Sequence, residues 1–331
     1  MAKINKHIEI AVTSDKRLSS MSIRSRNMIK DVLERYYKTV NISIVNDSSD
    51  LEKLISKNPD LVFSGVKRLP ISKYKSEGKG KNKDYVWVSV FLEERGIAVT
   101  GSGAVAYNLE QDKTKAKDVV NAAGLTTSPY FTAKKGQYTE ESQLPLDFPM
   151  FLKPYNRGGG VGIDDDSVVR NFNEFEAKIS SLVAKGIPKV LVENFLSGRE
   201  FTVAVLRDED GDELKAMPVE KIPEMNERGD RLMGHAMKST TDEIPIGVIK
   251  EGKLKEAVSN LARRSFKAIG ARDYGRIDIR LDENGAPSFL EANLLPSMID
   301  GSGNFPKAFC QNTGRSYDDM LLHIANLAFS H

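Results

Sequence analysis

Cysteine and histidine are scarce in this 331-residue chain, and both absences restrict what it can be. The one cysteine, Cys310, excludes a disulfide within the chain. The four histidines, His7, His235, His323 and His331, are scattered without the spacing of zinc ligands. The sequence therefore excludes a scaffold held by internal disulfides and gives no support to a zinc centre.

Long hydrophobic runs and a strong net charge are also missing. No stretch approaches the ~20 apolar residues of a membrane span, and the first residues lack the apolar run of a secretory signal peptide. A net charge of +2 is too small to favour nucleic acid or a membrane surface as a partner. We therefore expect a cytoplasmic protein with no nucleic-acid partner and no membrane partner.

The composition that is present, 40% hydrophobic and 28% charged residues, is that of a soluble globular protein of two or three domains. Strands are expected at residues 8–12, 42–45 and 61–63, separated by helices at residues 23–36 and after Asp50. This order predicts a parallel sheet with right-handed crossovers. No Gly-x-Gly-x-x-Gly motif follows the first strand, which argues against a dinucleotide-binding domain.

Residues 67–83 hold seven basic side chains with glycines and serines between them. That composition is typical of a mobile, solvated loop, and a lid or an anion-contacting loop is the alternative. A helix from Asp84 to Arg95 is expected next, with the single tryptophan, Trp87, in the core.

A strand at residues 97–99 leads through a Gly-Ser-Gly turn into two helices. The second helix is expected from Asp112 to Ala123, with Asp112 as its N-cap. Lys113 then lies in the first turn, where the helix dipole disfavours a cation. A lysine in that place is either solvated or kept for an anionic ligand.

A glycine-rich loop follows a strand expected at residues 148–152, which ends in Lys153. The glycines are Gly158, Gly159, Gly160 and Gly162. Without Cβ atoms in the way, the backbone N–H groups of such a loop can close over phosphate oxygens. The loop is not a Walker A motif, because the lysine precedes the glycines. A glycine-rich turn alone is weak evidence, and the lysine on the adjoining strand strengthens the case for a phosphate site.

The most informative stretch is a β-hairpin with strands at residues 276–281 and 288–292 and an Asn-Gly dipeptide in its turn. Side chains alternate between the faces of a strand, so Asp278 should lie close to Glu291 and Asn293. Three hard oxygen ligands in apolar surroundings suit Mg²⁺, which completes its shell with water and phosphate oxygens. The alternative is a set of ordinary hairpin charges, paired with arginines on a solvated face.

Four motifs in this order resemble the ATP-grasp superfamily, and within it the D-alanine–D-alanine ligase branch. The carriers are Thr-Gly-Ser-Gly followed by Gln111-Asp112-Lys113, then Phe-Leu-Lys153-Pro before the glycines, Val-Glu193-Asn-Phe-Leu-Ser-Gly-Arg-Glu200, and Gly275-Arg276-Ile-Asp278 with Glu291-Ala-Asn293-x-x-Pro296. The resemblance implies an α/β and α+β chain with the ATP-grasp fold. Its parts would be an N-terminal parallel α/β substrate domain at 1–102, a central ATP-grasp lobe at 103–195 and a C-terminal lobe with the Mg²⁺ site at 196–331, the two α+β lobes enclosing ATP.

The resemblance also implies how the nucleotide is held. Lys113 and Lys153 would contact the ATP phosphates, and the glycine-rich loop would cover them. Glu193 and the backbone around Leu196 would hold adenine at the hinge between the lobes. Glu200 would accept the ribose hydroxyls.

The remaining implied roles belong to the reacting groups. Lys238, within the long polar segment 222–246, would reach the γ-phosphate. Two Mg²⁺ ions, with Mn²⁺ as an alternative, would be held by Asp278, Glu291 and Asn293, and Glu291 would bridge them. Arg276 would stabilise the oxyanion formed during acyl transfer. Ser302 would bind the carboxylate of the second substrate.

The activity implied is that of an ATP-dependent, ADP-forming carboxylate–amine ligase, which joins a small carboxylic acid and an amino acid through an acyl phosphate. The sequence departs from the family in the amino-acid pockets: the first loop, residues 13–20, is basic and hydroxyl-rich, Ser239 replaces a tyrosine and Ser297 a glycine. Lys16 and Arg17 favour a first substrate that is anionic or lacks an α-amine, unless both side chains are simply solvated.

Three functions therefore stay open. The first is a ligase with a divergent amino-acid pocket, acting outside cell-wall synthesis. The second is a true D-alanine–D-alanine ligase of cell-wall synthesis, and the third is a non-catalytic ATP-binding sensor or partner protein. Related ligases are commonly dimers, which leaves a homodimer open as well.

Overall fold

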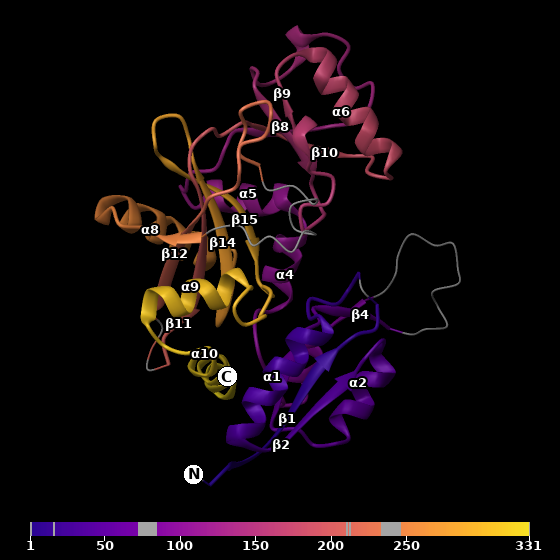
Figure 1. Ribbon diagram of the computed structural model, residues 1–331. Helices are drawn as coiled ribbons and strands as arrows, with labels where there is room; N and C mark the ends of the chain where they lie inside the picture. The colour runs from indigo at the N-terminus through magenta and orange to yellow at the C-terminus, as the bar shows by residue number, and fades with distance from the viewer. Residues whose placement is uncertain are drawn as a thin grey trace.

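The computed structural model describes residues 2–15, 17–71, 85–209, 211, 213–232 and 246–330. These residues form three lobes, each built on one β-sheet (Figure 1). The sheet of the N-terminal lobe is parallel, and the sheets of the central and C-terminal lobes are antiparallel. This combination confirms the predicted fold class. Lys16 and Lys238 lie outside the described residues.

The N-terminal lobe is a four-stranded parallel sheet with helices in its crossovers, as the sequence predicts. Its elements are β1 (Ile4–Val12), α1 (Ile23–Tyr36), β2 (Tyr37–Ile44), α2 (Ser48–Ile55), β3 (Leu61–Ser64) and β6 (Ala98–Val99), in strand order β2-β1-β3-β6. Parallel strands covered on both faces carry continuous apolar runs, and Ile8, Ile10 and Val62 are fully buried. The loops after β1 and β3 emerge at the carboxyl edge of the sheet, where ligands of such sheets bind.

One secondary-structure prediction in this lobe is wrong. The structure has β4 (Arg68–Pro70), β5 (Tyr85–Trp87) and α3 (Val88–Glu93) where a basic loop and one continuous helix from Asp84 were expected. Tyr, Val and Trp side chains favour an extended strand beside a partner, and the antiparallel pairing with β4 overrides the helical pattern. Trp87 is half-buried and stacks on Tyr107, with 6.4 Å between ring centroids. Residues 72–83 of the expected loop lie outside the described residues.

The central lobe is a four-stranded antiparallel sheet covered by one helix. Its elements are β7 (Tyr130–Ala133), β8 (Met150–Pro154), β9 (Val168–Val169), α6 (Phe172–Ala184) and β10 (Val190–Asn194), in strand order β7-β10-β8-β9. The side chain of Asn171 caps α6 by accepting a hydrogen bond from the N–H of Glu174. Phe175, Ile179 and Leu182 lie on one face of α6 and are buried against the sheet.

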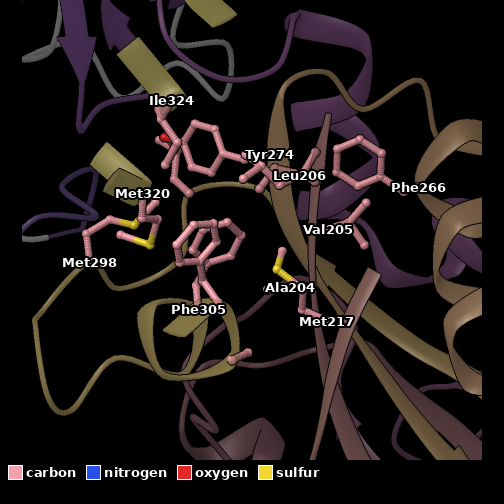
Figure 2. Packing of buried hydrophobic residues seen from close by; sticks show 14 of the residues in the cluster. Ala204, Val205, Leu206, Met217, Phe266, Tyr274, Met298, Phe305, Met320 and Ile324 are labelled. Atoms are coloured by element: carbon pink, nitrogen blue, oxygen red, sulfur yellow. The ribbon is translucent and has the colours of Figure 1, made fainter. Parts of the chain in front are cut away.

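The C-terminal lobe is a five-stranded antiparallel sheet with helices on its faces. Its elements are β11 (Glu200–Arg207), β12 (Leu214–Lys221), β13 (Ile246–Val248), α8 (Gly252–Ala268), β14 (Tyr274–Leu281), β15 (Pro287–Asn293), α9 (Asn304–Thr313) and α10 (Tyr317–Phe329), in strand order β13-β12-β11-β14-β15. Figure 2 shows Phe266 of α8 beside Val205 of β11 and Phe305 of α9 on the other side of that strand. Within the described ranges no helix is long and apolar enough to cross a membrane.

Three helices join the lobes. α4 (Ala104–Gln111) and α5 (Lys113–Ala122) follow the N-terminal lobe, and both pack against β15 of the C-terminal lobe. The carboxylate of Asp112 accepts hydrogen bonds from the N–H groups of Thr114 and Lys115, which confirms the predicted N-cap. α10 packs against α1, β3 and β6, and the ion pair between Arg35 and Asp318 spans 2.7 Å. The last helix therefore completes the core of the first lobe.

The predicted hairpin forms with the predicted register. β14 and β15 pair antiparallel so that Asp278 lies opposite Glu291 and Arg276 lies opposite Asn293. A bulge follows Asp278, where the register shifts before Ile279. The turn closes through Gly285, whose φ of +80° is one that a residue without a Cβ adopts readily.

The core of the C-terminal lobe gives a stability prediction. Phe305 is fully buried and its ring lies edge-on to that of Tyr274 at 5.7 Å between centroids. Replacing Phe305→Ala should lower the free energy of unfolding by about 3–5 kcal/mol, because a cavity replaces the ring. Urea denaturation followed by circular dichroism measures the change. Val105→Ala on the exposed face of α4 is the control and should change stability by less than about 0.5 kcal/mol. Equal stability of both variants would contradict this packing.

Candidate active site

A cleft lies between the sheets of the central and C-terminal lobes. Its walls come from β8, β10 and the glycine-rich loop on one side, and from β11, β12, β14 and β15 on the other. Eight of the residues singled out from the sequence line it: Lys113, Lys153, Gly160, Glu193, Leu196, Glu200, Asp278 and Glu291. Segments from residue 113 to residue 291 therefore converge on one site, as the motif order predicts.

Other predicted residues lie beside the cleft lining or away from it. Gly158, Gly159 and Gly162 belong to the same loop as Gly160. Gly162 has a φ of +80°, and a Cβ there would lie 2.9 Å from Pro154 Cγ, so only glycine fits without a shift. Arg276 and Asn293 lie opposite each other on the hairpin, two register positions from the paired Asp278 and Glu291.

Ser302 and Lys238 are not placed in the cleft. Ser302 lies in the turn before α9, where its N–H donates to the carbonyl of Ile299, and it does not line the cleft. Lys238 is outside the described residues. The roles expected for these two side chains stay predictions.

The innermost charge of the cleft is the carboxylate of Glu193 on β10. It is 2% exposed and lies 2.5 Å from Lys117 Nζ and 2.6 Å from Lys153 Nζ. The hydroxyl of Ser128 donates a third contact at 3.1 Å. Burial raises the pKa of Glu193, but the two lysines outweigh it and lower the pKa to about 2. Glu193 is therefore ionised and fixes Lys153 at the cleft wall.

Lys117 is a site residue that the sequence analysis missed. Its side chain is fully buried and also reaches the hydroxyls of Thr127 and Ser128. Burial lowers the pKa of Lys117 despite the charge of Glu193. The pKa of Lys153, by contrast, is raised, because Glu193 and Glu291 outweigh the effect of burial. Its spacing of four residues from Lys113, on one face of α5, is the signal that could have identified Lys117.

Lys113 lies in the first turn of α5 and is buried. It is 7% exposed, so the solvated alternative is wrong. Its Nζ donates to the carbonyl of Arg157, at the start of the glycine-rich loop, and lies 3.4 Å from the carboxylate of Glu291. A cation in this place joins the loop to the hairpin.

A second group of charges surrounds Asp278. Lys221 Nζ lies 3.2 Å from Glu200 and 3.3 Å from Asp278. Thr202 donates its hydroxyl to Asp278 at 2.6 Å, and Arg276 Nε lies 3.1 Å from the same carboxylate. Burial lowers the pKa of Lys221, but Asp278 and Glu200 outweigh it and the pKa is raised. Lys221 was also missed, because nothing in the β12 sequence marks it before the strands pair.

The hairpin side chains have the chemistry of a magnesium site. Two carboxylates, from Asp278 and Glu291, face each other across adjacent strands, and the amide of Asn293 follows on β15. Asp278 is 5% exposed, so the alternative of a solvated face is wrong for it, although the expected arginine pairing is present. The described ranges contain no group of three or more His, Cys, Asp or Glu side chains able to hold a metal. A site of two carboxylates and an amide needs phosphate oxygens to complete it, as Mg²⁺ sites of nucleotide enzymes do.

The fold matches solved D-alanine–D-alanine ligases. A Bacillus anthracis structure complexed with ATP superposes with a TM-score of 0.72 and 21% identity, covering 98% of each chain. Another crystal structure of the enzyme from that organism superposes with a TM-score of 0.73 and 22% identity, again covering 98% of each chain. Three lobes with a cleft between two antiparallel sheets are the ATP-grasp fold, which this chain shares with these ligases.

Sequence comparison then gives the family. The model described as "D-ala D-ala ligase C-terminus" matches residues 119–326, and the chain belongs to this family. The D-alanine–D-alanine ligase of Desulforudis audaxviator is 32% identical over 243 residues, 73% of this chain and 76% of the relative. That of Alcanivorax borkumensis is 33% identical over 232 residues, 70% and 68% of the two chains.

The depressed pKa of Glu193 predicts a pH dependence of stability. An unfolded glutamate titrates near pH ~4.3, so the ionised carboxylate stabilises the fold fully above that pH and this contribution is lost as the pH falls toward 2. Glu193→Gln should be less stable than the unaltered chain at pH 7 by about 3 kcal/mol, the equivalent of that shift. This difference in the free energy of unfolding between the variant and the unaltered chain should become smaller below pH ~4.5.

Urea denaturation from pH 7 to pH 3 measures the gap. Glu176→Gln, on the exposed face of α6, is the matched control and should follow the unaltered chain at every pH. A gap for Glu193→Gln that stays constant over this range would show that the two lysines do not depress the pKa of Glu193.

Proposed function

We propose that the chain is an ATP-dependent, ADP-forming carboxylate–amine ligase that forms an amide through an acyl phosphate. The observation that carries the proposal is the convergence of Lys113 and Lys153 with the paired carboxylates Asp278 and Glu291 in one cleft. A carboxylate oxygen of the acid attacks the γ-phosphorus of ATP and ADP leaves. An amine nitrogen then attacks the acyl carbon. The bond from that carbon to the phosphate oxygen breaks, phosphate leaves with its electron pair, and the nitrogen loses a proton.

The cleft supplies what the first step requires. Both reactants are anionic, and the cleft lining holds five cationic side chains against four carboxylates: Lys113, Lys153, Arg157, Lys221 and Arg280 against Glu193, Glu200, Asp278 and Glu291. Lys113 and Lys153 contact the phosphates in this assignment, and the N–H groups of the glycine-rich loop cover them and exclude water. Glu200 accepts the ribose hydroxyls, and the backbone at Leu196 holds adenine.

The hairpin acts on the reacting end. Asp278, Glu291 and Asn293 would hold Mg²⁺, which would supply positive charge to offset the repulsion between the carboxylate and the triphosphate. Arg276, whose Nε and Nη2 donate to Asp278, is oriented to stabilise the oxyanion of the second step. Lys238 is assigned to the γ-phosphate and Ser302 to the carboxylate of the second substrate, on the motif resemblance alone.

The acid substrate is the part that distinguishes two versions of this function. The names of the relatives favour D-alanine for both substrates. The composition of the loop after β1, which is basic and rich in hydroxyls, favours another acid. Within the loop, Thr13 and Ser14 both donate to the side-chain oxygen of Asn46. Arg17 forms an ion pair with Asp15 at 2.6 Å, so part of its positive charge is already neutralised within the loop. We favour a ligase whose amino-acid pocket differs from that of a housekeeping enzyme.

Three further assignments belong to the proposal. The chain divides functionally into an N-terminal substrate domain at 1–102, a central lobe at 103–195 and a C-terminal lobe at 196–331. It works in the cytoplasm, where ATP is available. A homodimer is the assembly suggested by the resemblance.

The metal assignment predicts separate effects on folding and turnover. Asp278→Ala and Glu291→Ala should remain folded by circular dichroism and form ADP at less than about 1% of the rate of the unaltered chain, because the hairpin then lacks an oxygen ligand. A coupled assay of ADP formation measures the loss once a substrate pair is found. Glu283→Ala in the exposed hairpin turn is the matched control and should keep full activity. Retained turnover of either cleft variant would remove the metal assignment.

The choice of acid predicts the outcome with D-alanine. Incubation with ATP, Mg²⁺ and D-alanine alone should release little phosphate, and pairs of amino acids and small acids should include one that releases it rapidly. A housekeeping D-alanine–D-alanine ligase in the same assay is the reference. Turnover of D-alanine comparable to that reference would establish the true D-alanine ligase. If the chain binds ATP but releases no phosphate with any pair of amino acids and acids tested, the non-catalytic ATP-binding protein would be favoured.

A further inference from the structure

Arg280 is a buried cation of the cleft lining to which the proposed reaction assigns no contact with a substrate or nucleotide group. It lies on β14, on the same face as Arg276 and Asp278, and is 7% exposed. It borders the cleft and also a neighbouring pocket lined by Gly198, Glu200, Lys221 and Arg231. Burial lowers the pKa of its guanidinium, so the charge is kept there against an unfavourable environment.

The guanidinium of Arg280 holds three separate segments together. Its Nε donates to the carbonyl of Gly198 at 3.2 Å, in the turn that connects the two lobes. Its Nη1 lies 3.4 Å from Glu200, and its Nη2 donates to the carbonyl of Arg231 at 2.9 Å. The planar group also lies 5.3 Å from the ring centroid of Phe195. A fork of fixed geometry can serve three acceptors at once, which a lysine ammonium on a flexible stem does less well.

Residues 222–232 also form ion pairs with the central lobe. Arg170, which follows β9 in the central lobe, contacts both carboxylate oxygens of Asp230 at 2.8 and 2.9 Å. Arg228 reaches Glu174 of α6 at 2.8 Å. Adjacent residues of this segment are thus held by opposite walls of the cleft, and the next one, Leu232, lines the cleft itself.

Glu200 is the point where this arrangement meets the nucleotide. Lys221 contacts one of its carboxylate oxygens at 3.2 Å and Arg280 the other at 3.4 Å. Each oxygen has a second lone pair and can still accept a ribose hydroxyl. A hydroxyl bound there restricts the carboxylate to one orientation, and the guanidinium that pairs with it is restricted in turn.

We propose that Arg280 is a positioning residue that couples the binding of the ribose hydroxyls at Glu200 to the seating of residues 222–232 along the cleft. The proposal rests on the proposed function, in which Glu200 holds the ribose. Removing the guanidinium leaves the carboxylate held by Lys221 alone and the carbonyl of Arg231 without its donor from β14. Binding of the ribose at Glu200 then no longer stabilises the position of residues 222–232.

The test compares two nucleotides on two variants. Isothermal titration calorimetry with Mg²⁺ present gives Kd for ATP and for 2′,3′-dideoxyATP, which lacks both hydroxyls. The unaltered chain should bind ATP at least tenfold more tightly. Arg280→Met should lose most of this ratio through weaker binding of ATP, with little change for dideoxyATP. Arg280→Lys, which keeps the charge, should retain an intermediate ratio, and Arg264→Met on the exposed face of α8 should match the unaltered chain.

Limited trypsin digestion reports on the segment. ATP should slow cleavage after Arg228 and Arg231 in the unaltered chain several-fold, as identified by mass spectrometry, and dideoxyATP should slow it less. In Arg280→Met neither nucleotide should protect these bonds. An equal loss of affinity for both nucleotides, or full protection by ATP in Arg280→Met, would overturn the coupling and leave the ligase assignment standing. Failure of the unaltered chain to bind ATP would overturn the ligase assignment together with this inference.

Discussion

The pairing of Glu193 with Lys117 and Lys153 is the interaction on which the cleft depends. Three charges are taken out of water within a few ångströms, and each is tolerated only because the others are present. The attraction of the carboxylate to both ammonium groups offsets their mutual repulsion, and it holds Lys153 at the cleft wall before any ligand binds. Charged groups arranged in advance need little reorganisation when an anion binds, which is where most electrostatic assistance to phosphoryl transfer comes from. The carboxylates of the hairpin are also paired with cations in advance. Lys221 and Arg276 form ion pairs with Asp278, and Lys113 forms one with Glu291.

Sheet register is what brings these pairs together. β14 lies between β11 and β15, so Asp278 is aligned with Thr202 on one side and Glu291 on the other. A shift of one residue would turn Asp278 into the core and Ile279 toward the cleft, which the apolar packing of β14 opposes strongly. The hydrophobic core therefore determines the chemistry of the cleft, although no core side chain takes part in it.

Local signals in the sequence predicted much of this structure. The alternation around Asp278 and the Asn-Gly turn predicted the hairpin, and the cap at Asp112 predicted the start of α5, because both depend on neighbours in the chain. The roles of Lys117, Lys221 and Arg280 were not predicted, since they arise from partners on other segments that only the folded chain brings near. The strand at Trp87 was misassigned for a similar reason: its partner at Arg68 is distant in sequence.

The position of α10 has a consequence for how the chain is made. This helix covers α1, β3 and β6, and the pairing of Arg35 with Asp318 joins residues 283 positions apart. Synthesis runs from the N-terminus at about 5–20 residues per second, so the first lobe leaves the ribosome many seconds before the helix that covers it. Throughout that interval an apolar face of the nascent lobe has no native cover. Chaperones that recognise exposed apolar surface should therefore bind the first lobe during translation and leave once residues 317–329 have emerged.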